Sequence, residues 1–135
     1  MNPMVPFLWI AGGVHLAIAV SNFGVPGILH YRENLAKLSP IVRQVFVVHS
    51  IYTVLVLLAF SALCIFFAPE LASGAPLDRF LSGFLALFWL LRVGLQFGYY
   101  DRGVRSKYRV GDVAYTLAIS CLGVVFAVVA LGVVR

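Results

Sequence analysis

Four apolar stretches dominate this sequence, and each is long enough to cross a lipid bilayer as a helix. They cover approximately residues 6–23, 41–67, 79–100 and 112–134. A hydrocarbon core about 30 Å thick requires about 20 helical residues. The composition agrees, because 62% of the residues are hydrophobic and only 11% are charged, whereas about 25% of the residues in a soluble domain are charged. The sequence therefore predicts an all-α fold, a transmembrane four-helix bundle that forms a single membrane domain.

The segments between these stretches contain residues that end or begin helices. Gly24 and Pro26 predict the end of the first helix. Residues 30–40 form the most polar part of the chain and predict a short amphipathic helix at the membrane surface. Pro40 and Pro76 predict the first turns of the second and third helices, because proline is favoured at that position.

The basic residues are concentrated in two of the three connecting segments. By the positive-inside rule, we expect both basic segments in the cytoplasm and both termini outside, in a bacterial inner membrane. Topology also accounts for the net charge of +5. No interleaving of basic and aromatic residues suggests nucleic acid as a partner. The basic segments with their flanks hold Arg32, Lys37, Arg43, Arg102, Arg105, Lys107 and Arg109.

The third stretch carries polar side chains well inside its apolar sequence. An arginine within a span costs about 2.5–3.5 kcal/mol on insertion scales and indicates a functional site by default. With about 100° of rotation per residue, one stripe of this helix contains both polar and aromatic groups. That stripe must face protein or a cavity rather than lipid. It consists of Arg92, Leu85, Phe88, Trp89, Gln96 and Tyr99.

The other stretches place polar groups in the same predicted cytoplasmic half. His49 and Arg92 both lie about 12 Å from the cytoplasmic ends of their helices. His15 and Asn22 share one face of the first helix, and Thr116 lies in the cytoplasmic half of the fourth. We therefore expect a polar pocket among the four helices that opens toward the cytoplasm. The small residues Ala11, Gly12 and Ala19 beside His15 either permit close helix approach or leave a cavity.

Each of these residues has a structural and a functional interpretation. Arg92 either pairs with Asp112 or backbone carbonyls, or clamps a carboxylate, phosphate or thiolate through its planar guanidinium. His49 is either an ordinary hydrogen-bonded histidine or a proton-transfer group. On the functional interpretation, His49 and Arg92 are the catalytic residues. The ligand-binding residues are then Arg92, Gln96, Trp89, Tyr99, His15, Asn22 and Thr116.

The sequence leaves the cofactor open. His15 and His49 come from two helices at similar depth, which is the arrangement that two axial haem ligands require. A quinone would suit an intramembrane pocket with a polar end. No HxxxH motif or carboxylate cluster predicts a metal site. Cys64 and Cys121 lie within apolar stretches without metal-ligand spacing, so we interpret them as buried thiols.

Residues Trp89 to Arg109 resemble a motif of the membrane-associated eicosanoid and glutathione metabolism (MAPEG) proteins. In that family an arginine precedes a Gly-Tyr pair near the cytoplasmic end of the third span, as Arg92 precedes Gly98-Tyr99 here. The resemblance implies that Arg92 stabilises a thiolate or another anion, and that the protein forms trimers. The family's Arg…Asn…Glu signature in the second span is absent, because this chain has His49 and no Glu there. This difference argues against glutathione.

Two classes of function fit these observations. The first is an integral membrane protein that binds or modifies a lipophilic small molecule with an anionic or quinone-like head. The alternative is an accessory or structural subunit of a larger membrane protein complex. We expect the lipid bilayer as one partner, and further copies of this chain or other membrane subunits as the second.

Overall fold

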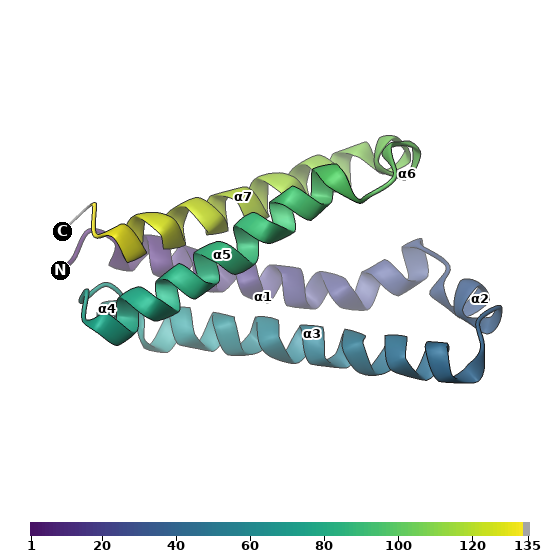
Figure 1. The fold of residues 1–135 in the computed structure, drawn as a ribbon, viewed down its shortest axis with the longest axis horizontal. Helices are drawn as coiled ribbons and strands as arrows, with labels where there is room; N and C mark the ends of the chain where they lie inside the picture. The colour runs from purple at the N-terminus through teal and green to yellow at the C-terminus, as the bar shows by residue number, and fades with distance from the viewer. Residues whose placement is uncertain (134–135) are drawn as a thin grey trace. The chain divides into compact units, whose positions relative to one another are not determined.

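The computed structural model describes residues 1–133, and these residues form helices and connecting turns without any strand. Four helices are long and apolar enough to cross a membrane, which confirms the predicted all-α fold of an integral membrane protein. Three short helices, α2, α4 and α6, lie in the connections (Figure 1). In chain order the helices are α1 (Val5–Ile28), α2 (Tyr31–Ala36), α3 (Pro40–Phe66), α4 (Ala68–Leu71), α5 (Pro76–Gly98), α6 (Arg102–Lys107) and α7 (Arg109–Leu131).

The predicted end of the first helix near Gly24 is wrong, because α1 continues through Pro26 to Ile28. Proline removes its own N–H donor and crowds the preceding turn, yet the next turn still forms, with the Leu29 N–H donating to the Val25 carbonyl at 2.9 Å. Such prolines are tolerated in transmembrane helices. The helix ends where His30 adopts a left-handed backbone, with φ of 51°.

The predicted starts of the second and third helices at Pro40 and Pro76 are confirmed. The polar segment between the first two spans does contain a helix, α2, whose position at the membrane surface stays a prediction. Helix α6 was not predicted; it is capped by Asp101, which accepts a hydrogen bond from the Val104 N–H. Helix α7 ends before Gly132, whereas the predicted fourth span reached residue 134, which lies outside the described residues.

The chain divides into two compact units. The first, which we call the α1–α3 unit, is Ile10–Phe66. The second, the α5–α7 unit, combines Met1–Trp9 with Phe67–Arg135. The N-terminus is tied to the α5–α7 unit, because the Asn2 side-chain amide donates to the Ala72 carbonyl at 2.9 Å.

Within the α1–α3 unit, α1 approaches α3 closely at Gly12. A Cβ atom at this position would lie 2.7 Å from Ile65 Cγ1 and 3.3 Å from the Ser61 carbonyl oxygen. The Ser61 hydroxyl donates to the Gly12 carbonyl at 2.8 Å, and this hydrogen bond is buried. The close approach predicted for the small residues of the first helix is therefore found at Gly12.

Within the α5–α7 unit, α5 and α7 pack against each other. The contact is closest at Gly123, where a Cβ atom would lie 2.8 Å from Leu90 Cδ2. Leu85 on α5 and Phe126 on α7 are both fully buried. This packing fixes the position of α5 relative to α7. It therefore also positions the polar side chains at the ends of these helices that we predict to be cytoplasmic.

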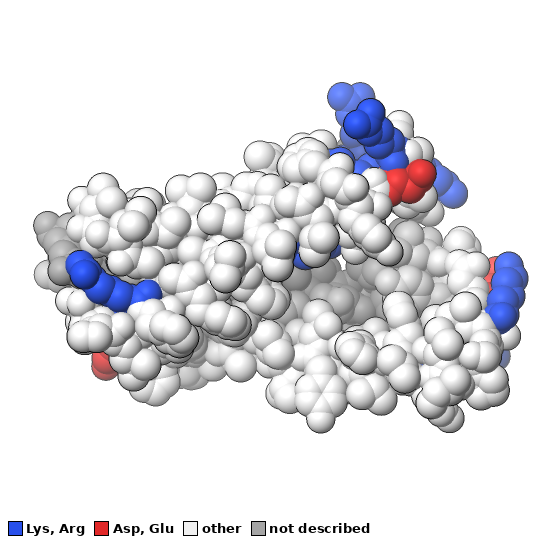
Figure 2. Space-filling view, viewed as in Figure 1, with Lys and Arg blue, Asp and Glu red and all other residues white. Residues whose placement is uncertain are grey.

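The predicted orientation can be tested with a reporter enzyme that is active only outside the cytoplasm. We expect activity when the reporter follows Arg135 and no activity when it follows Lys107, at the end of α6. Lys and Arg side chains gather over α6, as Figure 2 shows. A fusion after Ser73, between α4 and α5, is the matched control and should be active. A cytoplasmic reporter after Arg135 would contradict the orientation.

Candidate functional site

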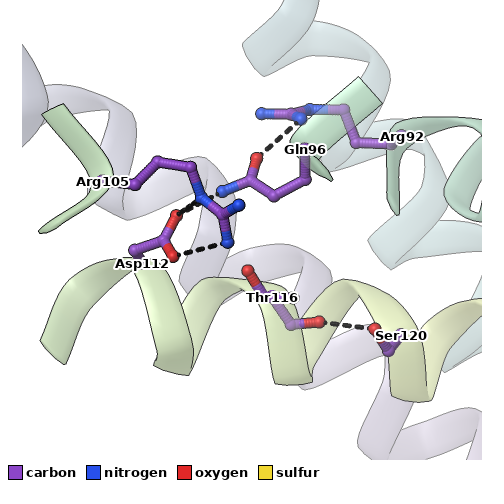
Figure 3. Close-up of polar contacts among 6 residues, drawn as sticks. All are labelled: Arg92, Gln96, Arg105, Asp112, Thr116 and Ser120. Carbon is purple, nitrogen blue, oxygen red and sulfur yellow. Dashed lines mark hydrogen bonds and ion pairs between the residues drawn. The ribbon is translucent and has the colours of Figure 1, made fainter. Parts of the chain in front are cut away.

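Polar side chains of the α5–α7 unit form a continuous hydrogen-bonded group (Figure 3). Arg92 Nη1 donates to Gln96 Oε1 at 2.9 Å, and Gln96 Nε2 donates to Asp112 Oδ1 at 2.6 Å. Arg105 completes the group, because its Nε and Nη2 donate to the two Asp112 carboxylate oxygens, each at 2.9 Å. We call these residues (Arg92, Gln96, Arg105 and Asp112) the Arg92 network.

The local sequence explains how the network assembles. Arg92 and Gln96 are four residues apart on α5 and therefore lie one above the other on the same face. Asp112 lies in the first turn of α7, where the helix dipole favours a carboxylate. Arg105 comes from α6, which the Asp101 cap holds in helical form between the two long helices.

The structure does not contain the direct ion pair between Arg92 and Asp112, which was one interpretation of the sequence. Asp112 is instead paired in a bidentate manner with Arg105, and the hydrogen bonding that Arg105 donates to Asp112 raises the pKa of Arg105 above its usual value. Arg92 reaches Asp112 only through Gln96. Among residues 1–133, no carboxylate lies within ion-pair distance of Arg92.

Two tyrosine rings flank the Arg92 guanidinium. Its Cζ atom lies 5.0 Å from the centroid of the Tyr100 ring and 5.2 Å from that of Tyr115. At these distances each ring makes a cation–π interaction with Arg92. The two interactions stabilise the positive charge of Arg92, which is only half-buried. Arg92 Nη2 also lies 3.4 Å from the Tyr100 hydroxyl, which is at the long end of the hydrogen-bond range. The Arg92 guanidinium thus contacts two aromatic rings and an amide, but no carboxylate among the described residues serves as its counter-ion.

Three further predicted residues lie in the same unit with different environments. Trp89 is buried and packs edge-on against Phe88, with ring centroids 5.2 Å apart. Tyr99 is 82% exposed, and its ring meets the Tyr100 ring edge-on, with centroids 6.3 Å apart. The Thr116 hydroxyl is buried and has no hydrogen-bond partner among the described residues. Figure 3 shows it on the side of α7 that carries Asp112.

The remaining predicted residues, His15, Asn22 and His49, belong to the α1–α3 unit. Each bonds to a carbonyl four residues earlier in its own helix, at 2.7, 2.8 and 2.8 Å respectively. His15 is buried and its ring meets Phe60 edge-on at 5.7 Å, whereas His49 is exposed. That His49 and Arg92 act in one site, and that four helices line one pocket, therefore stay predictions.

Sequence reasoning missed three contributors to the site. Arg105 was counted only as a loop charge, although it is the ion-pair partner of Asp112. Tyr115 lies three residues after Asp112 on α7, so helical spacing was a usable signal for it. Tyr100 follows the end of α5 at Gly98, where helical spacing no longer applies, and no sequence signal identified it.

No group of three or more His, Cys, Asp or Glu side chains in the described part of the chain is arranged to hold a metal ion. Comparison of the sequence and the structure with protein-family models, curated proteins and solved structures finds no significant match. The geometry of the Arg92 network is therefore the main basis for a functional hypothesis.

Proposed function

We propose that this integral membrane protein binds a lipophilic small molecule whose anionic head is held by Arg92. One observation carries the proposal: a guanidinium within a membrane-spanning helix has no carboxylate partner among the described residues. A charge in this position is costly, and a bound anion would offset that cost. A carboxylate, phosphate or thiolate fits the planar guanidinium fork best, and a quinone-like head would offer carbonyl acceptors.

The rest of the network orients Arg92. Asp112 accepts a hydrogen bond from the Gln96 amide nitrogen, so the Gln96 carbonyl oxygen is the atom that faces Arg92. Arg105 neutralises Asp112, which leaves that carboxylate unavailable as the counter-ion of Arg92. The Thr116 hydroxyl, four residues beyond Asp112, has no hydrogen-bond partner in the described part of the chain and would supply a further polar contact for a ligand.

We further propose that the protein lies in a bacterial inner membrane and that His49 moves a proton if the ligand is modified. The His49 Nδ1 lies within hydrogen-bond distance of the Val45 carbonyl oxygen. A carbonyl oxygen can only accept a hydrogen bond, so Nδ1 carries the hydrogen. Nε2 of a neutral ring is then the proton acceptor. The resemblance to the eicosanoid and glutathione metabolism proteins assigns Arg92 the same task, the stabilisation of an anion.

A second candidate function, an accessory subunit of a membrane complex, is favoured by the first half of α3. Residues 40–53 are all exposed. Among them, His49 and Thr53 share a face, and each bonds to a carbonyl of its own helix. Polar side chains on an exposed half of a transmembrane helix favour contact with another membrane helix. That helix would belong to a further copy of this chain or to a partner subunit.

Native mass spectrometry of protein released gently from its own membrane tests the proposal. We expect a reproducible small-molecule adduct on the wild type. The Arg92→Leu variant should bind it about tenfold to a hundredfold more weakly, because a hydrogen bond to a charged group contributes about 1.5–3 kcal/mol. Arg92→Lys keeps the charge but loses the planar fork, so it should bind with intermediate affinity.

The exposed Arg102 provides the control, since Arg102→Leu removes one charge outside the Arg92 network. This variant should retain the adduct at the wild-type level. Equal adduct levels in Arg92→Leu and the wild type would refute the proposed site. Stoichiometric polypeptides without any adduct would instead support the subunit function.

A further inference from the structure

The α1–α3 unit contains a groove that shares no residue with the Arg92 network. It lies where the end of α1, the short helix α2 and the first half of α3 meet, and it has a volume of about 450 Å³. Small-molecule sites usually have volumes of about 300–1,000 Å³. None of the lining residues belongs to the network, because all of them come from residues 22–54.

The lining favours a hydrocarbon chain. Eight of the eleven lining residues are apolar, and Phe23, Phe46 and Ile51 are the largest aliphatic and aromatic side chains among those on the two long helices. Two of the three polar lining residues each donate one hydrogen bond within their own helices. Asn22 donates to the Ile18 carbonyl at 2.8 Å, and Ser50 donates to the Phe46 carbonyl at 2.9 Å. The groove therefore presents mainly apolar surface, with few donors for a polar ligand.

The helices that form this groove carry a basic group of residues. Residues 10–66 contain three basic residues, Arg32, Lys37 and Arg43, and one acidic residue, Glu33. Arg32 lies on α2 next to the lining residue Tyr31, Lys37 follows α2 directly, and Arg43 is in the first turn of α3. Figure 2 shows Lys and Arg side chains gathered over α2. Basic residues beside a transmembrane helix end attract anionic lipid head groups.

We infer that this groove binds one acyl chain of an anionic phospholipid, whose phosphate is held by the basic residues of α2 and the start of α3. Apolar lining and positive charge occur together at one end of a helix pair, which matches the two chemical parts of such a lipid. The site goes beyond the proposed function, since it uses a different unit and none of the residues of the Arg92 network.

Obstructing the groove tests the acyl-chain part. Protein in detergent is mixed with phosphatidylglycerol or phosphatidylcholine, and the retained lipid is measured by native mass spectrometry. Ser50→Phe places a ring in the groove and should weaken phosphatidylglycerol retention at least about tenfold. The ring displaces part of the acyl chain, and exposure of about two of its methylene groups to water is enough for a tenfold loss of affinity. Val48→Phe is the matched control, since Val48 is on the same helix, is 49% exposed and does not line the groove.

Charge removal tests the head-group part. The wild type should retain phosphatidylglycerol in preference to phosphatidylcholine. The triple variant Arg32→Gln, Lys37→Gln, Arg43→Gln should retain both lipids equally. The control triple variant Arg102→Gln, Lys107→Gln, Arg109→Gln removes the same charge near α6 and should keep the preference.

Photo-crosslinking tests the site in the unmodified protein, independently of whether any variant folds. A phosphatidylglycerol with a photoreactive group in its acyl chain should label Phe46 and Ile51 rather than Val48. Equal labelling of both faces of α3, equal retention by Ser50→Phe and Val48→Phe, or no preference between the two lipids would each overturn the inference.

The two ligand proposals fail independently of each other. Arg92→Leu should retain phosphatidylglycerol, and Ser50→Phe should retain the Arg92-dependent adduct. Loss of phosphatidylglycerol in Arg92→Leu would assign that lipid to the Arg92 network and overturn the groove site.

Discussion

The substitution Gly12→Val is expected to destabilise the α1–α3 unit strongly. The first added carbon would lie 2.7 Å from Ile65 Cγ1, 3.2 Å from Cys64 Cβ and 3.3 Å from the Ser61 carbonyl oxygen. Two of these atoms cannot move without the α3 backbone, so the helices must separate. Separation also lengthens the buried Ser61–Gly12 hydrogen bond of 2.8 Å. Overpacking of this kind costs about 1–3 kcal/mol, and the weakened bond adds about 1 kcal/mol.

The adjacent glycine provides a matched control. A Cβ atom at Gly13 would have no neighbouring heavy atom within 4 Å, so Gly13→Val changes the same helix without crowding α3. The folded fraction of each variant in mixed micelles, followed during titration with sodium dodecyl sulfate, measures the free energy of unfolding. Equal losses for Gly12→Val and Gly13→Val would show that α1 and α3 do not meet at Gly12.

The substitution Gln96→Leu is expected to disconnect Arg92 from Asp112. Gln96 is only 5% exposed and makes a hydrogen bond to each of these residues, at 2.9 and 2.6 Å. Leucine has nearly the same size but cannot donate or accept, so Arg92 loses its closest acceptor. Removing a hydrogen bond to a charged group costs about 1.5–3 kcal/mol of unfolding free energy. We also expect the Arg92-dependent adduct to be weakened, because the guanidinium is no longer oriented.

Gln44 allows the same substitution outside the network. It is exposed on α3, so Gln44→Leu should leave both the unfolding free energy and the adduct close to their wild-type values. The denaturant titration and native mass spectrometry give the two readouts. Unchanged stability and unchanged adduct in Gln96→Leu would show that Gln96 neither supports the unit nor positions Arg92.

Part of the Arg92 network could be predicted from the sequence. A spacing of four residues places Arg92 and Gln96 on one helical face in any α-helix, and the structure joins them by a hydrogen bond. The partner of Asp112 could not be predicted, because it depends on α6. This helix of six residues is capped by Asp101, and it brings Arg105 to the carboxylate that the sequence interpretation had offered to Arg92.

Some helix boundaries could also be predicted from the sequence, and others could not. Pro40 and Pro76 begin their helices as predicted, because a proline in the first turn removes an N–H that has no helical partner. Pro26 was interpreted in the opposite sense, as part of a helix end, yet α1 continues past it. The local cost of a proline is about 3 kcal/mol. Whether a helix tolerates that cost depends on its surroundings, which a sequence window does not contain.

The sequence by itself determined that this chain forms four helices of membrane-spanning length. Backbone polar groups in a lipid bilayer must be satisfied within the segment, so an apolar stretch of about 20 residues has little alternative to a helix. Tertiary structure alone decided the partner of Asp112, the tyrosine rings beside Arg92 and the groove beside α2. These features depend on where the ends of different helices meet, and that position is set by packing at residues such as Gly12 and Gly123 rather than by local sequence.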